Sequence, residues 1–234
     1  MNTNQTKPNI VFIVAHPDDL AHSMGGTAYL MKEKYQLHVL CLTKGEHGIK
    51  GKSHDEAAAI REKEEAAACQ ILNANLSFLG QIDGQTYANK EICEKVSLLL
   101  GALQPQAVFT LWPINEHPDH VVVHGIATKA LQLAGIYRQT ELYFSENVMG
   151  AQTNQFSPDI YINISEVIEI KSELIKCHVS QNPIDKGVDN ILQRNIFRGK
   201  LSGCLYAEAF KTNYPLTING PRKTGGVLLN LQNG

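Results

Sequence analysis

Strand-like and helix-like hydrophobic patterns alternate along most of the chain. Residues 9–15 are predicted to form a strand covered on both faces, because 10–14 are an unbroken β-branched and aromatic run. A helical pattern follows over 20–34, and the alternation then repeats. The further predicted strands are 37–42, 76–79, 107–112, 142–144 and 160–164, and the further predicted helices are 56–72, 90–103, 120–133 and 168–179. Asp55 is the expected cap of the helix that begins at Glu56.

This alternation predicts an α/β fold, a Rossmann-like domain whose mostly parallel sheet carries helices on both faces. The leading run of four strands and three helices predicts a sheet in which the strands, numbered along the chain, lie in the order 3-2-1-4-5. In that order strands 1 and 4 are neighbours, and ligands bind beyond the carboxyl ends of the strands at this switch point. The residues just after Ala15 and just after Trp112 are therefore expected to meet in space.

Length and composition favour one domain and a small-molecule substrate. The 234 residues suffice for a single domain over 1–234, with less regular tails at 1–8 and about 212–234. A formal net charge of −2 gives no electrostatic reason to bind nucleic acid or an anionic membrane. No stretch suits a membrane span or a signal-peptide core. The five cysteines are scattered without C-x-x-C pairs, so we expect a cytoplasmic protein. A homo-oligomer is left open.

Two similar clusters of histidine and aspartate follow the strands that flank the switch point. Residues 16–19 read H-P-D-D after the first strand, and residues 117–120 read H-P-D-H after the fourth. Imidazole nitrogens and carboxylate oxygens are suitable zinc ligands, and two histidines with one carboxylate leave a position open for water. The glycine fingerprint of dinucleotide-binding domains is missing after the first strand, which argues against plain nucleotide binding.

Each of these residues also has an ordinary structural explanation. Asp18 or Asp19 could cap the first helix, and His117 could be a loop histidine. His120 and His124 stand four residues apart and could chelate together, but the glutamate of an H-E-x-x-H motif is absent. The coincidence of two H-P-D elements at the same switch point favours a metal site over separate structural roles.

The chain resembles the LmbE-like/PIG-L deacetylase family from about residue 9 to 210. The two H-P-D elements carry most of this resemblance. The accompanying residues are Met24, Gly25, Gly26 and Thr27, then Thr43, Gly45, Glu46 and Gly48, then Arg61 and Glu64, then His178, Ser180 and Gln181, and finally Tyr206, Ala207, Glu208 and Phe210.

The resemblance implies a role for several of these residues. It implies that the zinc ligands are His16, Asp19 and His120. It further implies that Asp18 is the general base, that His117 stabilises the oxyanion, and that Arg61 contacts the substrate. The reaction implied is removal of an acetyl group from an N-acetylglucosaminyl conjugate.

The residues themselves leave other roles open. Asp119 either orients an imidazole through its second nitrogen or caps the following helix. Glu46 is expected to line the sugar pocket by its position after the second strand, and Arg61 could alternatively form an exposed helix salt bridge.

Alternatives also remain for the activity and the metal. The activity could instead be that of an amidase acting on a sugar-thiol conjugate, or the fold could serve as a non-catalytic metal- or ligand-binding module. Zinc, one ion per chain, is the expected cofactor, although manganese, iron or cobalt suit the same ligands.

Overall fold

A single sheet of seven strands forms the centre of the computed structural model, which describes residues 7–147, 155–182, 186–213 and 226–231. The strand order is β3-β2-β1-β4-β5-β7-β6. The first five strands in this order pair in parallel, whereas β7 runs antiparallel to both β5 and β6. The strands are β1 (Asn9–Val14), β2 (Gln36–Cys41), β3 (Ala74–Phe78), β4 (Ala107–Leu111), β5 (Glu141–Ser145), β6 (Ile160–Asn163) and β7 (Ala207–Thr212).

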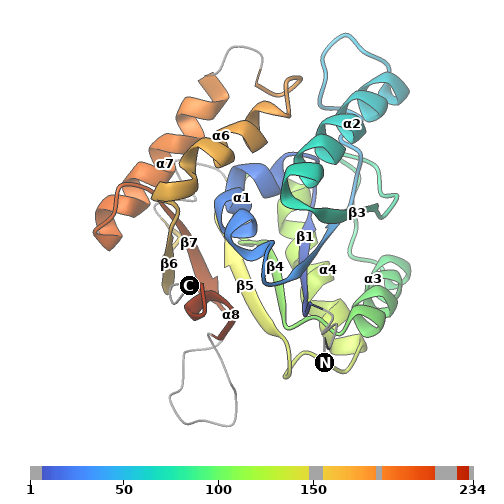
Figure 1. Ribbon diagram of the computed structural model, residues 1–234. Coiled ribbons are helices and arrows are strands. Elements are labelled where there is room, and N and C mark those ends of the chain that lie inside the picture. The colour runs from blue at the N-terminus through green and yellow to red at the C-terminus, as the bar shows by residue number, and fades with distance from the viewer. Residues whose placement is uncertain (1–6, 148–154, 183–185, 214–225, 232–234) are drawn as a thin grey trace, which may run out of the picture.

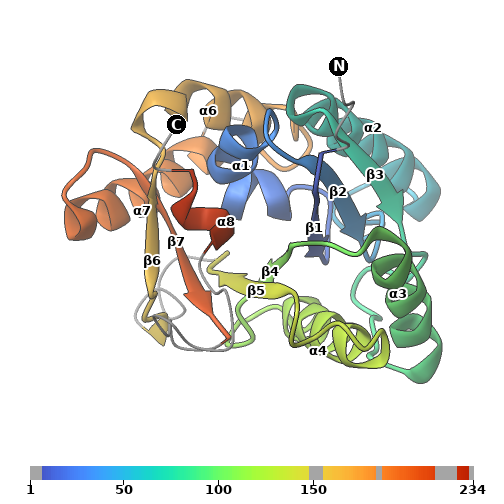
Figure 2. The same ribbon diagram turned by 60° about the horizontal axis from the view of Figure 1, so that its bottom comes forward.

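Helices cover both faces of the sheet, as Figures 1 and 2 show. On one face lie α1 (Asp19–Met31) and α2 (His54–Leu72), and on the other lie α3 (Lys90–Leu103) and α4 (Pro118–Leu133). The short helix η1 (Ser165–Val167) leads into α6 (Ile168–Lys176), which packs on α1, while α7 (Lys186–Ser202) packs on β7 and β6. The last described element is α8 (Gly226–Leu229). None of the described helices is long and apolar enough to cross a membrane.

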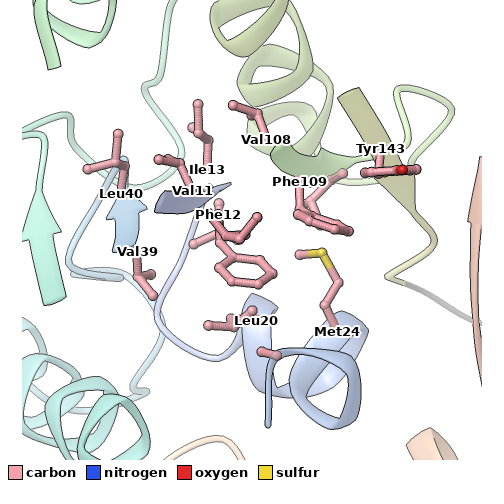
Figure 3. Close-up of a cluster of buried hydrophobic side chains, with 14 of the residues drawn as sticks. Val11, Phe12, Ile13, Leu20, Met24, Val39, Leu40, Val108, Phe109 and Tyr143 are labelled. Atoms are coloured by element: carbon pink, nitrogen blue, oxygen red, sulfur yellow. The ribbon is translucent and has the colours of Figure 1, made fainter. Parts of the chain in front are cut away.

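The core follows from the alternation of side chains along the central strands. Phe12 on β1 stacks on Phe109 on β4, with ring centroids 5.1 Å apart. Figure 3 shows both rings directed toward α1, where Leu20 and Met24 lie, while Val108 points toward the opposite face. Because both faces are buried, these strands are largely apolar, which is the pattern that predicted them.

A buried ion pair anchors α1 to the second half of the chain. Glu208 on β7 accepts hydrogen bonds from the backbone N–H groups of Gly26 and Thr27, and it pairs with the fully buried Lys171 of α6. A Cβ at Gly26 would lie 2.9 Å from Ile164, so only glycine permits this close approach. These contacts fix α1, the helix that begins at Asp19. They come from Glu208 on β7 and from Ile164 after β6, not from the central strands.

The predicted order 3-2-1-4-5 is confirmed. Strand β7 and the helices α7 and α8 were absent from the sequence-based expectation. The inward face of α7 carries Arg194, Asn195 and Arg198, each at most 3% exposed, so polar residues interrupt its apolar stripe. The expected cap of α2 was wrong: Ser53, not Asp55, occupies the cap position and forms a reciprocal capping box with Glu56.

The less regular tails fall largely outside the described part of the chain. Residues 1–6, 214–225 and 232–234 are not described, and the described remainder of the C-terminal stretch includes α8. Within the described residues the five cysteines are all free.

Candidate active site

The two histidine–aspartate clusters meet at the carboxyl ends of β1 and β4. These strands pair in parallel, with Phe12 opposite Phe109, so the turns that follow them emerge side by side. The Nδ1 atom of His16 lies 3.1 Å from the Nε2 atom of His120. The contact joins residues 104 positions apart in the chain, which is the meeting that the switch-point argument predicts.

Three donor atoms converge here in a geometry that suits a metal ion. Besides the 3.1 Å separation of the two imidazole nitrogens, His120 Nε2 lies 3.2 Å from Asp19 Oδ1. The second carboxylate oxygen of Asp19 lies 3.8 Å from His16 Nδ1. Ligands at zinc–nitrogen distances of about 2.0–2.1 Å in a tetrahedron stand about 3.3 Å apart. Ring nitrogens of His16, His117 and His120 all lie within 4.8 Å of one another, a spacing that could hold a metal ion, and Asp19 places a carboxylate oxygen 3.2 Å from His120 Nε2.

The outer nitrogens of both histidines already have partners. His16 Nε2 lies 3.1 Å from carboxylate oxygens of Asp119 and Asp83, and His120 Nδ1 lies 3.1 Å from the side-chain oxygen of Asn115. These acceptors place a proton on each outer nitrogen and leave the inner nitrogen free to coordinate. The donor set thus matches the arrangement typical of zinc-bound histidines.

A second group of possible metal ligands also includes His16, but the carboxylate oxygens of its Asp119 already accept hydrogen bonds. Oxygen or nitrogen atoms of His16, Asp83, His117 and Asp119 also lie within 4.8 Å of one another. The two oxygens of Asp119, however, accept hydrogen bonds of 2.7 Å from Gly84 N and Thr86 Oγ1. The cap position of α4 is held by His117, and Asp119 Oδ2 contacts His16 Nε2 at 3.1 Å.

The charges around His16 make metal binding dependent on pH. Burial lowers the pKa of His16, but the hydrogen bonds to Asp119 and Asp83 outweigh it and raise the pKa to about 10. For Asp19, burial raises the pKa, yet the neighbouring His120 and His16 hold it below its usual range. Because a coordinating imidazole must be neutral, a metal ion has to displace the His16 proton, and affinity should rise with pH.

Asp18 occupies a strained backbone position beside these donors. Its φ of 107° lies in the left-handed region, and its side chain does not cap α1. The Asp18 N–H donates to Glu65 Oε2 at 3.0 Å, and Arg61 Nη2 donates to Asp18 Oδ2 at 3.1 Å. Burial raises the pKa of Asp18, and the positive charge of Arg61 opposes that rise. The carboxylate is thus held at the pocket by contacts from α2.

Arg61 is buried and does not form the exposed helix salt bridge that its neighbours suggested. Its guanidinium is held by the backbone oxygens of Pro17 and Gly45 as well as by Asp18, and only 4% of the residue is exposed. A Cβ at Gly48 would lie 2.3 Å from Arg61 Nη1, so this loop must carry glycine for the guanidinium to fit. The glycine-punctuated loop after β2 therefore accommodates Arg61 at the pocket.

Replacing Arg61 with alanine should change both substrate affinity and pH dependence. Loss of a charged hydrogen-bond donor from the pocket should raise KM by about tenfold. Removing the charge that lowers the pKa of Asp18 should raise that pKa further, so Asp18 would become protonated at a higher pH. The acidic limb of the kcat/KM profile should therefore move to higher pH. Arg61→Lys keeps the charge and should leave the limb near its original position; an unshifted limb in Arg61→Ala would contradict the coupling.

His117 presents a neutral imidazole to the same pocket. Its Nδ1 accepts the backbone N–H of Asp119 at 3.3 Å, which places the ring proton on Nε2. Burial lowers the pKa of His117, and so do the charges of His16 and His120. In this state the ring is a neutral hydrogen-bond donor.

These groups line a cavity of about 780 Å³. Of the residues predicted for the site, Glu46 and Asp119 are missing from its lining. The Glu46 carboxylate instead accepts the N–H of Asp83 at 3.2 Å. The cavity-lining residues are His16, Asp18, Asp19, His22, His47, Gly48, Arg61, Asp83, His117, His120, Asn147, Gln181, Asn182, Asn190, Ile191 and Arg194.

Several of these lining residues were not anticipated from the sequence. Asp83 belongs to the segment after β3, and the Asp-Gly pair at 83–84 was the available signal for a turn there. Asn147 and Arg194 come from the chain after β5 and from α7, where no local motif marks them. The second half of the chain therefore supplies much of the pocket wall.

Comparison with known proteins places this chain among relatives of several activities. The sequence profile described as "PIG-L: GlcNAc-PI de-N-acetylase" matches residues 11–131, which is more than half of the 234 residues. A 4-oxalmesaconate hydratase of Pseudomonas putida is 25% identical, and the alignment covers 92% of each chain. A diacetylchitobiose deacetylase of Thermococcus kodakarensis is 26% identical over 86% of this chain and 82% of its own length.

A solved structure supports the same relationship. The conserved protein TT1542 from Thermus thermophilus superposes with a TM-score of 0.78 and 30% identity, covering 89% of this chain and 96% of its own. Together with the profile match, this confirms the family resemblance that the two H-P-D elements indicate. The chain belongs to the PIG-L family of de-N-acetylases.

Proposed function

We propose that this protein is a zinc-dependent hydrolase that removes the N-acetyl group from an N-acetylglucosamine-type conjugate. The observation that carries the proposal is the convergence of His16 Nδ1, Asp19 Oδ1 and His120 Nε2 beside the carboxylate of Asp18. A non-catalytic binding module needs no group in the position of Asp18. Membership of the PIG-L family and the deacetylase from Thermococcus kodakarensis support this reaction class.

His16, Asp19 and His120 would hold the zinc ion. When bound, zinc supplies a water whose pKa is lowered to near 7 and a positive charge at the reacting carbonyl. Two neutral imidazoles and one carboxylate are the donors that zinc takes in hydrolytic sites. The outer hydrogen bonds of both histidines fix the tautomers that such a site requires.

The remaining polar groups supply the proton transfers and the charge stabilisation. Asp18 takes a proton from the attacking water and returns it to the leaving amine. Arg61 holds the Asp18 carboxylate in place, and its positive charge favours the ionised form. His117 donates a hydrogen bond from its Nε2–H to the amide oxygen as negative charge develops there.

The pocket suits a hydroxyl-rich substrate. Amide side chains of Asn147, Gln181, Asn182 and Asn190 form a large part of the described wall, and amides both donate to and accept from hydroxyl groups. A cavity of about 780 Å³ lies within the range of small-molecule sites. We therefore expect the glucosamine ring and part of its aglycone to bind here.

Amine release from a panel of N-acetylglucosamine conjugates tests this function. The panel should include diacetylchitobiose, an N-acetylglucosaminyl malate, an N-acetylglucosaminyl inositol and a sugar-thiol conjugate amide. Each is incubated with zinc-loaded protein, with and without a chelator, and free amine is measured with fluorescamine. We expect chelator-sensitive release from at least one N-acetyl conjugate.

The other outcomes would each contradict the proposal in a different way. Release from the sugar-thiol amide alone would assign the amidase activity instead. No release from any member, by protein that contains stoichiometric zinc, would exclude the deacetylase. Addition of water to a carbon–carbon double bond, the chemistry named for the Pseudomonas putida relative, would then be assayed next.

A further inference from the structure

The side chain of Asn147 contacts the proposed metal ligand Asp19 directly. Asn147 lies just beyond β5, and its Nδ2 donates a hydrogen bond to Asp19 Oδ1. The same oxygen lies 3.2 Å from His120 Nε2 and therefore belongs to the donor set. A carboxylate only accepts hydrogen bonds, so the amide must present its nitrogen here.

A count of lone pairs shows how this contact restricts Asp19. An ionised carboxylate offers about four lone-pair sites on its two oxygens. Oδ2 accepts two backbone N–H groups, from Ala15 at 3.0 Å and from His16 at 2.8 Å. Oδ1 accepts the Asn147 amide. Counting the contacts made by the described residues, one lone pair is then left, on Oδ1, the oxygen that lies 3.2 Å from His120 Nε2.

Arg194 holds Asn147 in this position from a third part of the chain. It lies on α7, is 2% exposed, and donates from its two terminal nitrogens to the backbone oxygens of Asn147 and His22. His22 belongs to the first turn of α1, three residues after Asp19. The guanidinium therefore fixes the segment after β5 against the same helix turn that carries Asp19.

We propose that Asn147, held by Arg194, is a positioning residue that makes Asp19 a one-oxygen ligand of the metal. This inference rests on the proposed metal site. Without the amide, a second lone pair of Oδ1 becomes available, and the carboxylate is held only through Oδ2, by the backbone N–H groups of Ala15 and His16. Loss of a hydrogen bond to a metal ligand typically lowers metal affinity by about 10- to 100-fold.

The test measures zinc binding in the absence of substrate. Asn147→Leu removes the amide while keeping a side chain of similar size, and Asn147→Ala serves if the leucine variant does not fold. Zinc affinity of each stripped protein is measured by competition with a chromogenic chelator. We expect about a 10- to 100-fold weaker affinity than in the parent protein.

Asn195→Leu is the matched control. Asn195 is also buried, lies next to Arg194 on α7, and donates from Nδ2 to the backbone oxygen of Ala207 at 2.9 Å. It is not among the residues that line the cavity, so its loss should lower the thermal midpoint without changing zinc affinity. Equal affinity in the parent and both Asn147 variants would overturn the inference. A parent protein that binds no zinc would instead overturn the proposed function.

Discussion

His120→Ala should abolish stoichiometric zinc binding and reduce amide hydrolysis by at least about three orders of magnitude. The substitution removes Nε2, which lies 3.1 Å from His16 Nδ1 and 3.2 Å from Asp19 Oδ1. Only two of the three proposed ligands then remain, one fewer than the three protein ligands of a catalytic zinc site. Metal content after dialysis and amine release are the two measurements.

His124→Ala provides the control for this experiment. His124 lies one turn further along α4 and packs its ring against Phe144, with ring centroids 4.7 Å apart. It does not line the cavity, so this variant should retain zinc and activity even if its stability falls. Full zinc occupancy in His120→Ala would remove His120 from the ligand set.

Asp18→Asn should retain zinc but lose about 10²- to 10⁴-fold in kcat, the range expected for a lost general base. Asparagine has the same shape, can still accept the hydrogen bond from Arg61, and tolerates the left-handed backbone with its φ of 107°. The fold should therefore be preserved. The rate falls because an amide oxygen cannot take a proton from water near neutral pH.

The neighbouring carboxylate provides a direct contrast. Asp19→Asn changes a proposed metal ligand, so it should lower zinc content and rate together, whereas Asp18→Asn should lower the rate alone. Glu62→Gln, which alters an exposed ion pair with Lys44, should change neither. Unchanged kinetics in Asp18→Asn would rule out Asp18 as the base.

The sequence was sufficient to locate the centre of the site because its signals are local. Each H-P-D element follows a strand with an unbroken apolar pattern, and the parallel order 3-2-1-4-5 then brings His16 and His120 together. The order could be predicted because strands alternating with helices restrict the connections to a few topologies.

Much of the pocket wall could not be predicted because it depends on contacts between distant segments. Arg194 lies on a helix whose inward face is polar, so no apolar stripe marked that helix or its direction. Asn147 reaches Asp19 only because β5 ends beside β4. Glu46 was expected at the pocket by position alone, and the structure directs its carboxylate to Asp83 N instead.

Arg61 illustrates the difference between local and tertiary information. Surrounding glutamates made an exposed ion pair the ordinary interpretation of this helix residue. The loop after β2 and the turn after β1 instead enclose the guanidinium, through Gly45, Gly48 and Pro17. Its burial depends on those two loops, and the spacing of charges along α2 carries no information about them.

Zinc reconstitution tests the central claim most directly. Protein stripped with a chelator is titrated with zinc, and acetate and free amine are both measured from the best conjugate of the panel. Activity should be absent from the stripped protein, rise in proportion to added zinc, and level off at about one equivalent per chain, with equal amounts of acetate and amine. Full activity in protein shown to be free of metal, or amine release without acetate, would contradict the account.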